Sequence, residues 1–354
     1  MRAAAAPPDS DNLYCCFLMT LRRKLLISAI LLVCLAVLAF FLWRRAALPP
    51  EAARLLPEGD VLLYANLQPL HLFETDKLHP VQVEGDYRDF IDQTGIQFER
   101  DLEQVAMSRR DTPDGKDTES SEIFIGKFDQ QRLQSYLEKT SSRSEAYNNH
   151  AIYSIPHEGH LVRVSILDPH RVAVTNMEST TQIRGMIDAS AHPPPRGPSL
   201  LHDYYSRVPA TALAWLITRT PANSKAAQFP NGWSFDFLEN TVAVASLRYR
   251  GDVLFQADVI APTDPEAKRV SDAVTTFLWI SRSAAQSLNP RGTDPDVKAA
   301  FDSIQVGQNK NVAVVTATLS QRMLKKLVTE AQPESTAPVP SPSPEASKHR
   351  RRRR

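Results

Sequence analysis

Cysteine is scarce in this sequence and is confined to its N-terminal end. The chain of 354 residues has three cysteines, Cys15, Cys16 and Cys34, and none after them. The long remainder of the chain can therefore hold neither a disulfide nor a cysteine-ligated metal, and a cysteine nucleophile is excluded there. Cys15-Cys16 has the position of a palmitoylation site in a eukaryotic protein, but a poorly ordered tail is the interpretation that we prefer.

Glycine is also scarce, with 12 residues in the whole chain. The sequence has no Gly-x-Gly-x-x-Gly, no phosphate-binding loop of the Walker type and no Gly-x-Ser-x-Gly. These motifs use glycine to bring the backbone close to a phosphate or to expose a nucleophilic serine. Their absence removes the sequence signals of dinucleotide binding, of P-loop nucleotide hydrolysis and of a serine hydrolase.

Net charge is close to zero, because 41 Lys and Arg residues oppose 40 Asp and Glu residues. The distribution is uneven: residues 1–45 carry +4 and the last seven residues carry +6, which leaves −9 of the total of +1 for residues 46–347. A mildly acidic domain is not typical of a nucleic-acid surface. With 42% hydrophobic and 23% charged residues, the composition also excludes collagen-like, disulfide-scaffold and wholly disordered chains.

One long apolar run is present, Leu25 to Trp43, and it contains no charged residue. Its nineteen residues match the length that a helix needs to cross a bilayer, so the lipid bilayer is the first predicted partner. A cleaved signal peptide is the competing interpretation, but its apolar core is usually about 7–15 residues long and ends in small residues, not Trp-Arg-Arg. Cys34 does not fit a lipoprotein signal, because Val33 precedes it and apolar sequence continues beyond it.

The basic residues that flank this run give little indication of its orientation in the membrane. Arg22, Arg23 and Lys24 precede the run, and Arg44 and Arg45 follow it, so the numbers on the two sides are similar. A large domain that follows an N-terminal anchor usually translocates. We therefore expect a cytoplasmic N-terminus and an extracytoplasmic C-terminal domain on a single-pass protein of the bacterial inner membrane. Met19 has the context of a bacterial start, so either Met1 or Met19 fits as the true start.

The sequence divides into seven segments. Regular apolar patterns occupy about 54–331, where short alternating runs are interleaved with helical periodicity, which predicts an α+β fold built on antiparallel sheets with packed helices. The segments are a cytoplasmic tail (1–24), a transmembrane helix (25–43), a connector (44–53), a first α+β half (54–190), a Pro-rich break (191–199), a second α+β half (200–331) and a disordered Pro/Ser/Arg tail (332–354).

Several turn and cap residues locate elements within the two halves. We expect Gly95 to end one helix, Asp129 to cap another, Asp168-Pro169-His170 and Gly251-Asp252 to turn hairpins, and Asp264 to cap a long helix. The expected strands are 61–65, 122–128, 161–167, 171–175, 241–249, 253–260 and 312–319, and the expected helices include 87–93, one starting at Asp294-Pro295-Asp296 with Val297, Ala300 and Phe301, and 321–329.

The order of these elements suggests a duplicated unit. One set of elements comprises segments 102–108 and 123–128 and the helix from Asp129. It matches a later set, which comprises segments 301–306 and 312–319 and the helix from Gln321. The hairpin and helix at 161–189 likewise match those at 241–288. No sequence identity accompanies the pattern.

Histidines and carboxylates offer no convincing catalytic or metal set. His157-Glu158-Gly159-His160 has its histidines three apart beside Pro156, whereas a zincin needs them four apart on a helix, so a solvated hairpin turn is favoured. Asp101 with Glu103, or Asp236 with Glu239, could form a glycosidase pair, but ordinary surface acids are commoner. The segment 111–122 lacks calcium-ligand spacing. We assign no catalytic residue, no cofactor and no metal ligand.

The C-terminal run Lys348 to Arg354 has two interpretations. It could hold anionic lipid headgroups, envelope polymers or nucleic acid, at about 1 kcal/mol for each basic residue near an anionic membrane. A solvated tail is the preferred interpretation, and nucleic acid is an unlikely partner for an extracytoplasmic tail.

Three motifs carry a resemblance to a known group of proteins: Leu56-Pro57-Glu58-Gly59-Asp60, the segment Gly95 to Gln104, and Gly126-Lys127-Phe128-Asp129. The chain resembles uncharacterised bacterial envelope proteins that carry a domain of unknown function behind one N-terminal span. The likeness covers about 54–190, and its motifs are turns and caps, so it implies an envelope location and no active-site residue.

The leading hypothesis is a non-enzymatic binding or structural module of the cell envelope, whose partner is another envelope protein or polymer. An alternative is a membrane-tethered hydrolase with a site built from dispersed Asp, Glu and His. A third hypothesis, a cytoplasmic domain with its Arg tail on nucleic acid, has less support. A binding module predicts an apolar or aromatic patch, for which the aromatic candidates are Tyr204, Tyr205, Trp215 and Trp233. The sequence leaves the ligand and the oligomeric state open.

Overall fold

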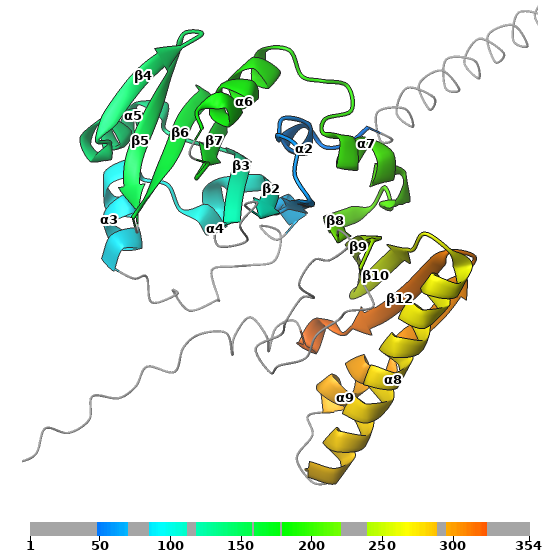
Figure 1. Ribbon diagram of the computed structural model, residues 1–354. Coiled ribbons are helices and arrows are strands. Elements are labelled where there is room, and N and C mark those ends of the chain that lie inside the picture. The colour runs from blue at the N-terminus through cyan, green and yellow to red at the C-terminus, as the bar shows by residue number, and fades with distance from the viewer. Residues whose placement is uncertain are drawn as a thin grey trace, which may run out of the picture.

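The computed structural model describes residues 48–69, 85–111, 118–157, 159–177, 179–220, 239–288 and 295–323. Its described strands form one sheet of 12, in which every neighbouring pair is antiparallel, with helices on both faces (Figure 1). The predicted α+β class with an antiparallel sheet and packed helices is confirmed.

The elements follow one another along the chain as α2 (Glu51–Arg54), β1 (Val61–Asn66), α3 (Gly85–Thr94), α4 (Phe98–Asp101), β2 (Leu102–Asp111), β3 (Thr118–Gly126), α5 (Gln130–Thr140), β4 (Arg143–Tyr147), β5 (His150–His157), β6 (His160–Asp168), β7 (Arg171–Thr175), α6 (Thr181–Ala191), α7 (Ser199–Tyr204), the 3-10 helix η3 (Tyr205–Arg207), β8 (Ala212–Thr220), β9 (Thr241–Arg250), β10 (Asp252–Ile260), α8 (Asp264–Leu288), α9 (Pro295–Asp302), β11 (Gln305–Asn309) and β12 (Val312–Leu319).

The sheet is continuous across the Pro-rich segment, because β1 pairs with β8 at its centre. From β1 the strands run outward as β2, β3, β7, β6, β5 and β4, and from β8 they run outward as β9, β10, β12 and β11. On each side, the third strand in chain order therefore pairs with the strand that comes last in the sequence of that side. These pairs are β3 with β7 and β10 with β12. The two predicted halves share one sheet through a pair of strands that are far apart in the sequence.

The two faces of the sheet bury different clusters. Leu62, Ile123, Trp215 and Ile217 lie on one face, which we call the core face, and they pack with residues of α2, α6 and α7. On the other face, here the opposite face, Phe124 packs with Leu133 and Leu137 of α5, and Val259 packs with Val270 of α8. Helix α5 and helix α8 thus cover the same face of the sheet at its two ends.

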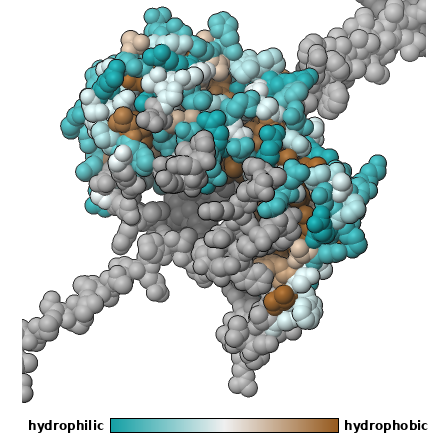
Figure 2. All heavy atoms as spheres, in the orientation of Figure 1, coloured by the Kyte–Doolittle hydropathy of each residue, from teal (hydrophilic) through white to brown (hydrophobic). Residues whose placement is uncertain are grey.

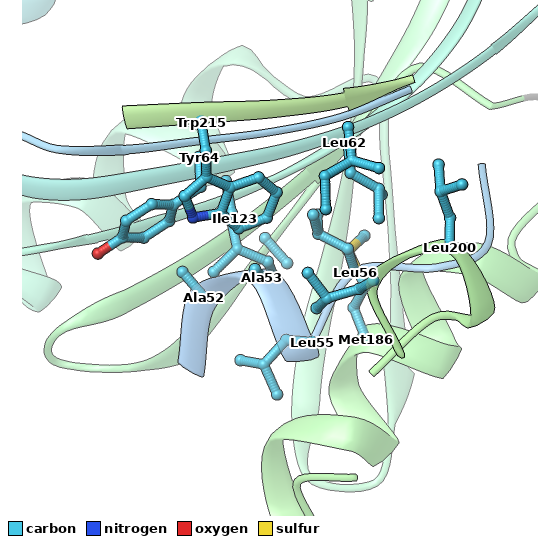
Figure 3. Close-up of a cluster of buried hydrophobic side chains, with 14 of the residues drawn as sticks. Ala52, Ala53, Leu55, Leu56, Leu62, Tyr64, Ile123, Met186, Leu200 and Trp215 are labelled. Atoms are coloured by element: carbon cyan, nitrogen blue, oxygen red, sulfur yellow. The ribbon is translucent and has the colours of Figure 1, made fainter. Parts of the chain in front are cut away.

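Helix α2 lies inside the main core. Ala52 and Ala53 are fully buried and Leu55 and Leu56 nearly so, between the sheet residues Leu62, Tyr64 and Ile123 and the helix residues Met186 and Leu200 (Figure 3). Burial of a leucine side chain contributes about 2 kcal/mol. The sequence placed residues 44–53 in a connector, whereas the structure includes Ala52 and Ala53 in the core, because the single methyl group of an alanine side chain fits where a helix meets a sheet closely.

The motif Leu56 to Asp60 joins α2 to both halves. The Glu58 carboxylate accepts from Ser199 N at 2.8 Å and from Ser199 Oγ at 2.6 Å, which satisfies the first turn of α7. Gly59 lies so close to β2 that an added Cβ would be 2.9 Å from the Arg109 carbonyl oxygen. The Asp60 N–H donates to the Arg109 carbonyl, and the backbone carbonyl of Asp60 accepts from the Arg219 N–H. The motif is therefore structural.

Most local signals are confirmed. Gly95 follows α3 with a φ of +74°, and the Asp129 side chain accepts from Arg132 N at the start of α5. Residues 168–170 turn the β6–β7 hairpin, and strand β12 has the predicted bounds. Ile183, Met186 and Ile187 lie on one side of α6, at helical spacing, and are buried.

Two local predictions were wrong in detail. Arg250 lies directly opposite Asp252, so the β9–β10 turn is centred on Gly251, with a φ of +87°, and is not a two-residue turn. Thr263, not Asp264, caps α8, because its Oγ1 accepts from Glu266 N and donates to the Glu266 carboxylate.

Several predictions concern residues outside the described ranges. These are the span Leu25 to Trp43, the tail 332–354, most of the predicted helix 321–329, and Trp233 and Asp236. Among the described residues, no helix combines the length and the apolar character needed to cross a membrane.

Candidate binding surface

An apolar row crosses the centre of the opposite face. Leu63 of β1 is the direct cross-strand partner of Met107 on one side and of Leu216 on the other. The same register continues from Leu216 to Ala245, Ala257 and Val315. Neighbouring side chains in such a row lie about 4.5–5.5 Å apart at Cβ, so the row forms a continuous apolar strip.

A second apolar row lies beside the first. Ala65 lies opposite Val105 and Ala214, and the register passes through Leu247 to Phe255. We call the large side chains of these rows on β1, β2, β8, β9 and β10 the central patch, and they are Leu63, Val105, Met107, Leu216, Leu247 and Phe255. Leu247 is 37% exposed and the other five are half-buried.

The helices of the opposite face lie on either side of the central patch. Helix α5 packs on β5 and β6, whereas α8 packs on β10, β11 and β12. Helices α2 and α7, which contact the central strands β1, β2, β3 and β8, belong to the core face. Five of the six side chains of the central patch lie on β1, β2, β8 and β9, and in the described part of the chain no helix packs on the opposite face of these four strands.

Glu122 of β3 interrupts the first apolar row, because it lies opposite Met107 on one side and Val174 on the other. Burial raises the pKa of the Glu122 carboxyl above its ordinary value, while a hydrogen bond from the Ser120 side chain opposes this shift. A half-buried carboxyl within an apolar row can donate a hydrogen bond when protonated. It is a single carboxyl with a hydroxyl beside it, whereas a glycosidase requires a pair.

The aromatic candidates from the sequence are core residues where the structure describes them. Trp215 is 3% exposed and stacks on Tyr64 with ring centroids 5.6 Å apart, and Tyr205 meets Trp215 edge to face at 5.8 Å. Tyr204 and Tyr205 pack against the same cluster. Burial, with the nearby Tyr205, raises the pKa of Tyr64 to about 12. These aromatics stabilise the core face and do not form a patch.

A smaller apolar surface lies where α8 and α9 meet. Trp279 is 69% exposed, Ile280 39% and Phe301 40%, and Arg282 ties the two helices by donating to the Phe301 carbonyl at 2.7 Å. Figure 2 shows that hydrophobic residues appear on the face in view as small separate spots among hydrophilic ones. Isolated spots of this kind are normal on a soluble domain.

The cavity described between α3 and α5 is shallow and polar. Its volume is about 340 Å³, and it is lined by Gln93, Gln131, Arg132, Ser135, Tyr136 and Lys139. Arg132 already donates to the carbonyls of Asp92 and Gln93, and Lys139 donates to the Gln93 side chain. Both cations therefore serve the C-terminal end of α3.

The predicted acid and histidine sets are dispersed. Asp101 accepts from Arg100 and from Gln97 N, while Glu103 accepts from Gln68. His157 and His160 face each other as the exposed closing pair of the β5–β6 hairpin. Among the described residues, no group of three His, Cys, Asp or Glu side chains could hold a metal ion.

Sequence analysis missed the central patch, although its signal was present. Leu63, Met107 and Leu216 alternate with buried residues of the core face, such as Leu62, Ala106 and Ile217, so the strands are apolar on both faces. Such strands read as continuous apolar runs, and their two faces separate only when the register is known.

Comparison with known proteins identifies no family. No family model matches the chain, and no curated protein matches it. The solved structures of TP0453 are similar in crystal form IV (14% identity, TM-score 0.43, covering 80% of this chain and 98% of that one), form III (14%, 0.43, 80% and 99%) and form I (13%, 0.44, 79% and 97%). A likeness of this size carries no function across to this chain.

Proposed function

We propose that the chain is a membrane-anchored extracytoplasmic protein of the bacterial cell envelope that acts as a non-enzymatic binding or structural module. The run Leu25 to Trp43 supports the anchor, and the resemblance carried by Leu56 to Asp60, Gly95 to Gln104 and Gly126 to Asp129 supports the envelope. The central patch is the single observation that favours binding, because apolar side chains on a sheet are normally covered by a helix or a second sheet.

The partner that fits the central patch is another envelope protein with apolar side chains. Five of its six side chains are half-buried aliphatic or aromatic groups, and Glu122 adds one polar group at its border. Interfaces between proteins combine an apolar centre with a polar rim. A polymer of sugars would require exposed polar donors and acceptors, which the patch lacks.

A photo-crosslinking amino acid placed at Leu247 tests this function in cells that make the full chain. We expect a defined adduct with one envelope protein at Leu247, and none at Leu161 of β6, which is 43% exposed but lies outside the patch. Equal adducts at the two positions, or no adduct at Leu247, would contradict a binding role for the patch.

We also propose that the two halves arose by duplication. In each half three consecutive strands are followed by a helix on the opposite face, α5 or α8, and a later strand returns beside the third strand. In this order, β1, β2 and β3 correspond to β8, β9 and β10. Helix α5 corresponds to α8, and β7 corresponds to β12. This correspondence differs from the correspondence in the sequence, which matched α6 of the core face with α8 of the opposite face. An experimental structure should superpose these two sets by one rotation of about 180°, and a fit that needs different helix faces would contradict duplication.

A further inference from the structure

The chain passes from the predicted membrane span into the protein core within a few residues. Residues 44–48 are the only ones between Trp43 and Pro49, and Pro49 is already buried. Ala52 and Ala53 follow at 0% exposure in the core. Six residue steps from Trp43 to Pro49 reach about 20 Å at full extension. A flexible stalk is therefore excluded unless α2 leaves the core.

The point of attachment lies on the core-face side of the sheet. Helix α2 packs among residues of α6 and α7 on that face. The loop 192–198, which joins α6 to α7, contacts the end of α2: the Arg54 guanidinium donates to the Pro194 carbonyl at 3.5 Å, and a Cβ added to Gly197 would be 2.8 Å from the Arg54 Cα. Loop 192–198 therefore lies close in space to the point where the chain leaves for the anchor.

The exposed groups around this point suit a phospholipid surface. Leu48 is 47% exposed, and His192, Pro195 and Arg196 are exposed on the loop. The nearby carboxylates have partners within the protein: Glu51 and Asp168 bind Arg171, Glu58 binds Ser199, and Asp203 binds His202. Arg196 is the exposed charged side chain of the loop and also contacts the His202 ring, and a basic side chain near a bilayer favours anionic headgroups.

We propose that loop 192–198 and Leu48 contact the lipid headgroups, so that the core-face side of the domain rests on the bilayer and the central patch points away from it. This inference rests on the proposed anchor and adds the orientation of the domain. It also explains how an anchored module could present one face to a partner, because α5, α8 and the central patch share the face that is turned away from α2.

A labelling experiment on the full chain tests the orientation. Cys15, Cys16 and Cys34 are replaced by serine, and a single cysteine is introduced as Pro195→Cys or, as the control on α8, Lys268→Cys; the Lys268 side chain is 64% exposed. Each variant is labelled with a fluorophore and reconstituted into vesicles of phosphatidylethanolamine and phosphatidylglycerol that carry a headgroup-attached quencher. We expect severalfold stronger quenching at position 195 than at position 268.

A variant with a longer linker tests whether the short tether is what holds position 195 near the bilayer. Insertion of a Gly/Ser linker of about 20 residues between Ala47 and Leu48 gives a mean reach of about 25 Å beyond the original tether. Quenching at position 195 should then fall toward the value at position 268. Equal quenching at the two positions without the linker, or stronger quenching at 268, overturns the orientation while the anchor stands. Failure of all variants to float with the vesicles overturns the anchor itself, and with it the proposed function.

Discussion

Glu58 and Ser199 join two parts of the chain that are 141 residues apart, because the Glu58 carboxylate accepts from both the N–H and the hydroxyl of Ser199. The two hydrogen bonds hold the start of α7 against the segment that leads from α2 to β1. Since the Pro-rich segment ends at Ser199, this contact fixes where the second half begins.

Replacement of Glu58 by alanine should lower the free energy of unfolding by about 1 kcal/mol, as expected for the loss of a helix N-terminal cap. Denaturant unfolding of the full chain in detergent, followed by tryptophan fluorescence, measures the change. Glu138→Ala on the exposed surface of α5 is the control, and it should shift the midpoint much less. Equal effects of the two variants would show that the Glu58 contact does not stabilise α7.

Gly59 and Gly185 should respond to alanine in opposite directions. A Cβ at Gly59 would approach the backbone of Arg109 to 2.9 Å, whereas a Cβ at Gly185 of α6 would meet nothing within 4 Å. We expect Gly59→Ala to destabilise by about 1–3 kcal/mol through overpacking. Gly185→Ala should stabilise by up to about 1 kcal/mol, because alanine favours a helix interior. The same unfolding measurement applies, and a destabilised Gly185→Ala would contradict the open surroundings of that position.

The contrast between local and long-range contacts explains what could be predicted from the sequence. Gly95, Asp129 and the 168–170 turn act within a few residues, and each was found from residue type alone. The β4–β5 hairpin was missed, although Asn148 and Asn149, with φ of 45° and 64°, are typical of a two-residue hairpin turn.

The pairing of β1 with β8 and the burial of α2 could not be predicted, because neither leaves a periodic signal. Helix α2 has four residues, too few for a pattern, and the β1–β8 register joins strands that are separated by about half of the chain. The central patch depends on this pairing, since Leu63 and Leu216 become neighbours only through it. Sequence patterns therefore show that these strands are apolar on both faces, but they do not show which side chains form the candidate surface.

Stability should fall at alkaline pH because of Tyr64. Its pKa is raised to about 12 by burial, above the value of 10.0 for an exposed tyrosine. The unfolded chain therefore releases this proton at lower pH than the folded protein does, so stability is intact below pH 10 and decreases between about pH 10 and 12. The unfolding midpoint of Tyr64→Phe should fall less over this range than that of the unmodified protein. Parallel pH profiles would contradict the burial of the Tyr64 hydroxyl.

Glu122 should make a contribution of the same sign at acidic to neutral pH. Its pKa is raised above 4.5 by burial, so the folded protein binds this proton more tightly than the unfolded chain. Stability gained through Glu122 is present below the unfolded pKa and is lost as the pH rises through the folded pKa. Glu122→Gln should therefore be at least as stable as the unmodified protein at pH 7 and should lose this advantage in acid.

The control for Glu122 is Glu119→Gln on the same strand, where the carboxylate forms an ion pair with Arg110 at 3.0 Å. This variant should not gain stability at pH 7. If Glu119→Gln and Glu122→Gln have the same pH profile, the position of Glu122 between Met107 and Val174 has no special effect.

The most direct test of the central claim is protease accessibility of the domain in intact spheroplasts. The full chain carries a tag before the Arg tail, and a cytoplasmic protein in the same cells reports leakage. An anchored extracytoplasmic module predicts digestion of the tagged domain by external protease while the cytoplasmic control stays intact. Protection of the domain until the cells are lysed would contradict this topology and would place the domain in the cytoplasm.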